Sequence, residues 1–281
     1  MQRLFLVGCA RSGTTLLQSL LASHPEIASF PESEFFNHLF SHSEPKRKAL
    51  GLLSRRAKPQ LSKFLKEIGH KEQPLSPFLF FPHQLTTQFI KTLDHLASQE
   101  NKHIWIEKTP THLYHLDYIS QHVPNAQFIH ILREGKDAIA SLYDVRQKYP
   151  KQWANEPASV ELAVKRWIKD VSISLQYVDS SRHILVSYEA LVENPQHTLS
   201  QLCEFIGIAF HENMLSSYTA TAQQVSLARE PWKAGVAASI SNANSTKFYS
   251  LFTQQQQAYI LKHTESIDLD RCNTSPSTQK A

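Results

Sequence analysis

The chain has 281 residues, of which 41% are hydrophobic and 19% are charged, and its formal net charge is +4. This length suits one α/β domain with an added cap, and the composition allows a sizeable core. The small positive charge lacks the clustered excess of a nucleic-acid-binding protein, so we expect no nucleic-acid partner. It is compatible with a small anionic ligand.

Three cysteines, Cys9, Cys203 and Cys272, lie far apart and form no CxxC pair. This pattern is typical of a reducing compartment and predicts no disulfide scaffold. The first apolar run, LFLV, is too short for a signal peptide, and no run reaches the roughly 18 apolar residues of a membrane span. We therefore expect a cytoplasmic protein without a membrane span.

Four short apolar runs predict buried strands, and helical patterns separate them. In chain order they are residues 4–7, 103–106, 127–132 and 183–186, and a shorter strand is expected at 27–30. Strands that alternate with helices predict an α/β fold, in which helices flank a parallel sheet. Ligands of such sheets bind beyond the carboxyl ends of the strands.

Residues 43–98 show helical periodicity and no convincing strand pattern. We expect a helical insertion here, either a lid that helps to bind an acceptor or a solvated helical layer. Farther along, Asn194, Pro195 and Gly207 are typical of the two ends of a helix. A single domain is then expected to span residues 1–263, followed by a polar tail at 264–281.

A candidate phosphate-binding loop follows the first strand. Gly8 and Gly13 have the G-x-x-x-x-G spacing of a nucleotide phosphate loop between a strand and a helix. Glycines let successive N–H groups surround an anion, and the helix N-terminus adds partial positive charge. Thr14 stands where an ATP-dependent enzyme has the lysine that reaches the β- and γ-phosphates, which disfavours an ordinary kinase. Arg11 supplies a cation instead, and Thr15 a hydroxyl.

A second candidate anion site follows the strand at 127–132. Arg133 stands at the end of that strand, and Ser141 follows eight residues later, in a predicted helix. In isolation this pair is more typical of a surface ion pair and of a serine bonded to its own helix. Beside the first loop, however, it supplies the second anion site that a nucleotide phosphorylated at both ends of its ribose requires.

These motifs resemble those of the P-loop sulfotransferases that use 3′-phosphoadenosine 5′-phosphosulfate, in particular the branch with tyrosylprotein sulfotransferases and related bacterial enzymes. The resemblance is carried, in order, by RSGTTLL, HPEI, EKTP, FIHILREGKDAIAS and SYEALVENP. It implies an enzyme that moves a sulfuryl group to a hydroxyl or amine and releases adenosine 3′,5′-bisphosphate. No metal is expected, because arginine and lysine suffice for the small charge of a sulfuryl group.

The resemblance also implies roles for single residues. It places the 3′-phosphate of the donor on Arg133 and Ser141 and the adenine against Tyr188. Lys233, in EPWKAGVAAS, is the candidate cation of a loop that closes over the donor. The 5′-phosphosulfate is expected to bind the loop itself, which consists of Arg11, Ser12, Gly13, Thr14 and Thr15.

Sulfuryl transfer is an in-line displacement in which charge builds on the leaving oxygen, so positioning and electrostatic stabilisation should dominate catalysis. Arg11 and Lys108 are the cations expected at the leaving group. The resemblance makes Glu32 the expected general base, and His112 is the alternative. Without such roles, Glu32 would be a helix-capping carboxylate and Lys108 a surface residue.

Two other functions stay open: a P-loop kinase for a small metabolite, and a non-catalytic nucleotide-binding protein of the same fold. The acceptor is not specified, and a small cytoplasmic metabolite is preferred to a glycan, a lipid or a peptide tyrosine. The sequence also leaves the oligomeric state open. An apolar acceptor wall, or equally an ordinary core, is predicted from Phe78, Phe80, Phe81 and Trp105.

Overall fold

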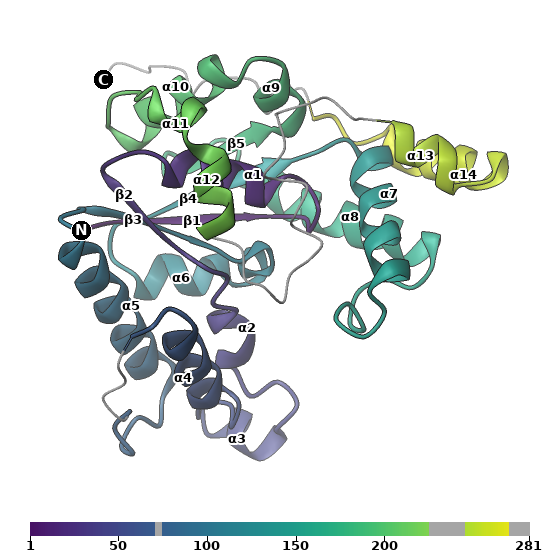
Figure 1. The fold of residues 1–281 in the computed structure, drawn as a ribbon. Helices are drawn as coiled ribbons and strands as arrows, with labels where there is room; N and C mark the ends of the chain where they lie inside the picture. The colour runs from purple at the N-terminus through teal and green to yellow at the C-terminus, as the bar shows by residue number, and fades with distance from the viewer. Residues whose placement is uncertain (71–74, 225–244, 270–281) are drawn as a thin grey trace.

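Five strands form one parallel sheet in the order β2-β3-β1-β4-β5 (Figure 1). The computed structural model describes residues 1–70, 75–224 and 245–269. All the predicted strands are present, with ends displaced by at most two residues, and the predicted α/β fold is confirmed. The strands are β1 (Gln2–Gly8), β2 (Ile27–Phe30), β3 (Ile104–Lys108), β4 (Ala126–Leu132) and β5 (His183–Ser187).

Side chains alternate along β1 between two apolar layers. Leu4 and Leu6 pack with the buried faces of α1 (Thr14–Ala22), α9 (Tyr188–Glu193) and α10 (Pro195–Ile206). The intervening Phe5 and Val7 pack on the opposite face with the helices between β2 and β3 and with α6 (Leu116–His122). Because β1 is central and buried on both faces, the loop that leaves it starts from a fixed point.

The described residues of the connection between β2 and β3 contain four helices, joined by loops, and no named strand. The first helix starts earlier than the sequence indicates, at Phe35. In Figure 1 these helices extend to one side of the sheet as a separate lobe. They are α2 (Phe35–Leu39), α3 (Pro45–Ala49), α4 (Ala57–Glu67) and α5 (Pro82–Gln99).

The aromatic residues expected to form an acceptor wall do not come together. Trp105 is completely buried and meets Phe5 edge to face, with ring centroids 5.4 Å apart. Phe78, Phe80 and Phe81 lie in the connection before α5 and are exposed, Phe78 by 75%. The alternative of an ordinary core therefore holds for Trp105, and the three phenylalanines lie on the surface.

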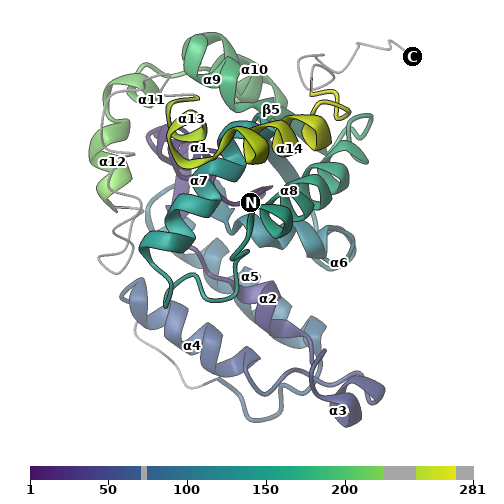
Figure 2. The same ribbon diagram turned by 90° about the vertical axis from the view of Figure 1, so that its right-hand side faces the viewer.

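Two further helical layers complete the fold. The helix signals at 194–207 are confirmed by α10: the Asn194 side chain accepts a hydrogen bond from the His197 N–H (3.2 Å), and Gly207 ends the helix at φ 84°. The C-terminal helices α13 (Thr246–Leu251) and α14 (Gln254–Thr264) pack on α7 (Gly135–Lys148) and α8 (Val160–Leu175) (Figure 2). The remaining described helices are η1 (Pro110–His115), α11 (Asn213–Ser216) and α12 (Tyr218–Gln224).

None of the helices in the described ranges has both the length and the apolar character needed to cross a bilayer.

Candidate active site

The loop between β1 and α1 depends on two glycines. A Cβ on Gly8 (φ 149°) would lie 2.5 Å from the carbonyl oxygen of Ile131 on the neighbouring strand β4. A Cβ on Gly13 (φ 94°) would lie 2.3 Å from the Tyr188 ring. Arg11 also has a left-handed backbone, at φ 71°. The loop can therefore curl before α1 because Gly8 and Gly13 lack side chains at the points where neighbours approach.

Two guanidinium groups meet at this loop. Arg11 Nε donates a hydrogen bond to Ser141 Oγ (3.3 Å), and Arg133 Nη1 donates one to the Arg11 carbonyl oxygen (3.4 Å). Burial, followed by the nearby Arg133 charge, lowers the pKa of Arg11. An anion bound here would offset both effects by favouring the charged guanidinium. Arg11, Arg133 and Ser141 thus share one cluster, although the sequence assigned Ser141 to Arg133 alone.

Ser12 gives a direct indication that the loop accepts a ligand. Its side chain is completely buried, and Ser12 Oγ has no hydrogen-bond partner among the described residues. Burying a hydroxyl without a partner is costly. The next residues, Gly13 and Thr14, begin α1, whose first N–H groups lack intrahelical acceptors. The hydroxyl, the helix N-terminus and the two arginines fit a phosphate or sulfate group.

Tyr188 connects the two predicted anion sites. It is the first residue of α9, directly after β5, and its ring packs on Gly13. The Arg133 guanidinium lies over the same ring, 4.3 Å from its centroid, in a cation–π contact. The sequence predicts Tyr188 beside the adenine. In the structure its ring contacts the phosphate loop and supports Arg133.

Glu32 and Lys108 meet at the carboxyl ends of the adjacent strands β2 and β3. Lys108 Nζ contacts Glu32 Oε1, and the Lys108 side chain is completely buried while that of Glu32 is 21% exposed. Gln18 of α1 fixes the end of β2, because its Nε2 donates to Ser29 Oγ (3.0 Å) and to the Phe30 carbonyl (2.8 Å). Lys108 is therefore an interior residue, and Glu32 retains access to solvent.

His112, the alternative general base in the sequence, is enclosed by protein groups. It is completely buried, and its Nε2 accepts a hydrogen bond from the Phe36 N–H (3.2 Å). Its Nδ1 is therefore the protonated nitrogen and donates to Glu107 Oε2 (2.9 Å). Both ring nitrogens are occupied by protein groups, so neither is available to an acceptor.

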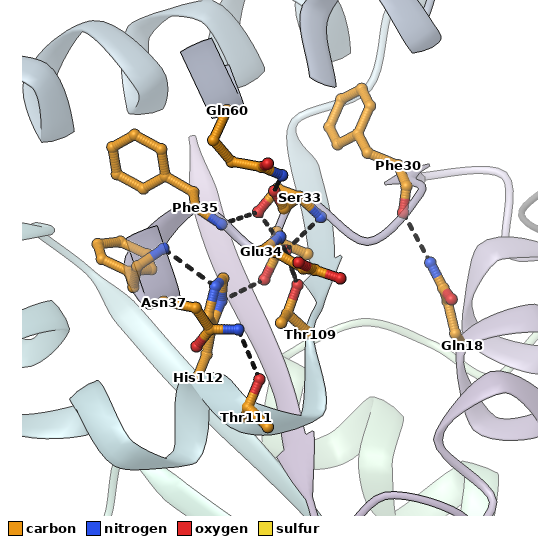
Figure 3. A network of polar contacts seen from close by, with 12 residues as sticks. Gln18, Phe30, Ser33, Glu34, Phe35, Asn37, Gln60, Thr109, Thr111 and His112 are labelled. Carbon is orange, nitrogen blue, oxygen red and sulfur yellow. Dashed lines mark hydrogen bonds and ion pairs between the residues drawn. The ribbon is translucent and has the colours of Figure 1, made fainter. Parts of the chain in front are cut away.

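Glu107 is a component that the sequence interpretation missed. It is completely buried beside Lys108 and accepts hydrogen bonds from Ser33, Thr109 and His112, which are labelled in Figure 3. A charged residue inside the apolar strand HIWIE was the available signal, because buried carboxylates need dedicated partners. The predicted closing-loop cation, Lys233, lies outside the described residues.

A hollow of about 130 Å³ opens beside Arg11, next to α7 and α13. Asp144 lies on its wall and holds Lys148 (2.9 Å) and Lys247 (2.7 Å). A larger hollow of about 480 Å³ lies at the opposite edge of the sheet, around Gln2, Asn125 and Arg182. Of the candidate site residues, Arg11 lines the smaller hollow, and it lies at the carboxyl edge of the sheet, where ligands of parallel sheets bind.

Comparison with known families agrees with this geometry. The sequence pattern of the sulfotransferase family matches residues 3–212, which contain both anion-site elements, Glu32 and Lys108. The chain belongs to the sulfotransferase family. It is accordingly a transferase, and the residues assembled at the carboxyl edge of the sheet lie within the part of the chain that defines the family.

Two sequence relatives are protein-tyrosine sulfotransferases by name. The chain is 22% identical over 260 residues to a putative protein-tyrosine sulfotransferase of Caenorhabditis briggsae, covering 90% of this chain and 82% of the relative. It is 25% identical to protein-tyrosine sulfotransferase 2 of Gallus gallus, covering 76% of this chain but only 53% of that protein.

Two solved structures share the fold. A sulfotransferase domain from the curacin biosynthetic pathway has a TM-score of 0.59 at 21% identity, covering 95% of this chain and 98% of the domain. A mouse sulfotransferase complexed with PAP has a TM-score of 0.57 at 15% identity, covering 96% of this chain and 87% of that one.

Proposed function

We propose that this sulfotransferase uses 3′-phosphoadenosine 5′-phosphosulfate as its donor and transfers the sulfuryl group to a hydroxyl or amine of a small metabolite. The observation that carries the proposal is the buried, unpartnered Ser12 hydroxyl beside Arg11, at the N-terminus of α1. A protein that bound no anion there would keep a costly orphan hydroxyl for no purpose. The mouse enzyme of similar fold, complexed with PAP, supports this choice of nucleotide.

The loop residues Arg11 to Thr15 would hold the 5′-phosphosulfate, and Arg133 with Ser141 the 3′-phosphate. When bound, the donor supplies the sulfuryl group and a nucleotide leaving group. Arg11 and Lys108 stabilise the negative charge that develops on the leaving oxygen, in a site where hydrogen-bond donors are already oriented. No reorganisation of water is then needed at the moment of transfer.

Glu32 is the proposed general base. Its carboxylate is partly accessible at the site, whereas the other candidate, His112, is buried with both nitrogens occupied. The Lys108 ammonium group contacts the Glu32 carboxylate before the acceptor arrives. When Glu32 takes the proton of the acceptor, Lys108 loses its carboxylate partner and can direct its ammonium group towards the leaving oxygen.

The donor assignment can be tested without knowledge of the acceptor. Adenosine 3′,5′-bisphosphate at 100 times its dissociation constant should stabilise the protein by about 2.7 kcal/mol, since it binds only the folded state. ATP with Mg²⁺ should protect less. Stronger protection by ATP would favour the kinase alternative and remove the donor assignment.

The catalytic role of Glu32 requires a turnover assay. A screen with radiolabelled donor should include hydroxylated and amine metabolites and a tyrosine peptide, because relatives are named protein-tyrosine sulfotransferases. Glu32→Gln should abolish turnover while leaving bisphosphate affinity within about twofold, whereas the exposed Glu34→Gln should act like the wild type. Donor binding without any transfer or hydrolysis would favour a non-catalytic binding protein.

A further inference from the structure

The segment that follows Glu32 has an unusual set of hydrogen bonds. All four backbone N–H groups of residues 33–36, including the start of α2, donate to side chains and not to the backbone. Three of these donors would otherwise be unsatisfied at a helix entrance. The acceptors, in chain order, are Glu107 Oε1 (3.3 Å), Thr109 Oγ1 (3.2 Å), Ser33 Oγ (3.2 Å) and His112 Nε2 (3.2 Å).

Glu107 is one of these acceptors, and it receives a hydrogen bond from each of the other three side chains. Its carboxylate receives Ser33 Oγ–H (2.7 Å), Thr109 Oγ1–H (2.7 Å) and His112 Nδ1–H (2.9 Å). Each of these groups donates to Glu107 and accepts from the segment, so its orientation is fixed from both sides. In Figure 3, Ser33, Thr109 and His112 converge in this way below Gln60, whose Nε2 donates to the Ser33 carbonyl (2.8 Å).

The carboxylate remains charged in this setting. Burial alone would raise the pKa of Glu107, but the hydrogen bonds that it receives from His112, Thr109 and Ser33 lower it below the usual value. A buried carboxylate is tolerated only with such complete pairing. The network also holds Glu34 in a left-handed conformation, φ 50°, which costs a non-glycine residue energy.

The position of this network in the chain links it to the proposed chemistry. Ser33 directly follows Glu32, and Glu107 directly precedes Lys108, so the Ser33–Glu107 bonds tie together the two segments that carry the ion pair. We propose that Glu107, acting through His112, Ser33 and Thr109, is a positioning residue that holds Glu32 at Lys108. This inference rests on the proposed function of Glu32 as the base.

Glu107→Gln is the sharpest perturbation, because it keeps the shape and removes one acceptor. The amide oxygen can still receive Ser33 and Thr109, but its NH₂ group would face the Nδ1–H of His112. If His112 changed tautomer, its Nε2–H would face the Phe36 N–H instead. Two donors oppose each other in either arrangement, so the segment 33–36 must loosen.

Asp94→Asn is the matched control. Asp94 also holds β3 through a side chain, since its carboxylate accepts from Trp105 Nε1 (2.8 Å) and pairs with Arg3 (2.8 Å). It acts at the amino half of the strand, away from Glu32. Loss of this pair should lower stability without changing the segment after Glu32.

The experiment combines amide hydrogen exchange of residues 33–36 with turnover and bisphosphate affinity. For Glu107→Gln we expect exchange at these amides to rise at least about tenfold and kcat to fall by about 10- to 100-fold, the scale of a 1 Å misplacement. Bisphosphate affinity should stay within about twofold. Asp94→Asn should change neither the exchange of these amides nor kcat.

Unchanged exchange and kcat in Glu107→Gln would overturn the proposal, as would an equal loss of kcat in Asp94→Asn. If Glu107→Gln does not fold, Ser33→Ala replaces it and should show the same pattern with smaller changes.

Glu32→Gln distinguishes a failure of the proposed base from a failure of the positioning role of Glu107. Should it keep full turnover, the proposed base is wrong, whereas a loss there with wild-type behaviour in Glu107→Gln removes only the positioning role.

Discussion

Replacing Gly13 with alanine tests how tightly the phosphate loop is packed. The new Cβ would lie 2.3 Å and 2.7 Å from two carbons of the Tyr188 ring, distances at which one group must move. The ring cannot simply move away, because the Arg133 guanidinium lies over it at 4.3 Å. The backbone at Gly13, φ 94°, adds strain for any residue with a side chain.

The magnitude follows from two separate costs. A left-handed backbone costs alanine about 1–2 kcal/mol, and forced overpacking costs about 1–3 kcal/mol. Gly13→Ala should therefore lower the free energy of unfolding by about 2–5 kcal/mol, as the sum of these ranges. Gly207 is a suitable control, since it has a similar φ of 84° and a Cβ added to it would meet nothing within 4 Å. Gly207→Ala should show only the backbone cost.

Urea unfolding followed by circular dichroism would measure these differences. The double variant Gly13→Ala/Tyr188→Ala should recover about 1–3 kcal/mol relative to the sum of the single changes, because it removes the collision and keeps the strain. Bisphosphate affinity should fall in Gly13→Ala and not in Gly207→Ala. A Gly13→Ala variant no less stable than Gly207→Ala would refute the packing described for the loop.

Two further outcomes are expected. Arg133→Ala should weaken binding of the bisphosphate by about 10- to 100-fold, the value of a charge-assisted hydrogen bond. Binding of adenosine 5′-phosphosulfate should weaken much less, because this ligand lacks the 3′-phosphate. Equal losses of affinity in titration calorimetry would show that the 3′-phosphate does not bind at Arg133. Stability should also fall on acidification below pH 6.5. Burial, with the nearby His183, lowers the pKa of His130 well below its usual value; burial, with the nearby Arg182, lowers that of His183 to about 4. Below pH 6.5 the unfolded chain therefore binds more protons than the folded protein. The free energy of unfolding should fall by about 1.4 kcal/mol per pH unit for each histidine, until that histidine is also protonated in the folded state. His183→Phe should reduce this slope in urea titrations at several pH values.

Much of the fold was predictable because its strands are short apolar runs with clear ends. The helix at 195–206 was equally readable, since Asn194 and Gly207 act through local backbone geometry that the sequence specifies. The early start of the inserted helices at Phe35 was not. The N–H groups of Glu34 and Phe36 donate to the side chains of Thr109 and His112, more than 70 residues away, and no local signal records these partners.

In the site, too, local features could be predicted from the sequence and contacts between distant segments could not. The loop glycines, Arg11 and Arg133 follow a spacing that a sequence displays directly. The surroundings of His112 could not be predicted, because they depend on what each ring nitrogen contacts, and one contact is the Phe36 N–H. The packing of Tyr188 on Gly13 likewise joins the first residue of α9 to the residue before α1, and only the folded sheet brings them together.

A crystal structure of the protein with adenosine 3′,5′-bisphosphate tests the central claim most directly. We expect the 5′-phosphate within hydrogen-bond distance of Ser12 Oγ and of the N–H groups of residues 12–15, with Arg11 beside it. The 3′-phosphate should contact Arg133. A nucleotide bound elsewhere, with the loop after β1 closed by protein atoms, would contradict the assignment of donor and site together.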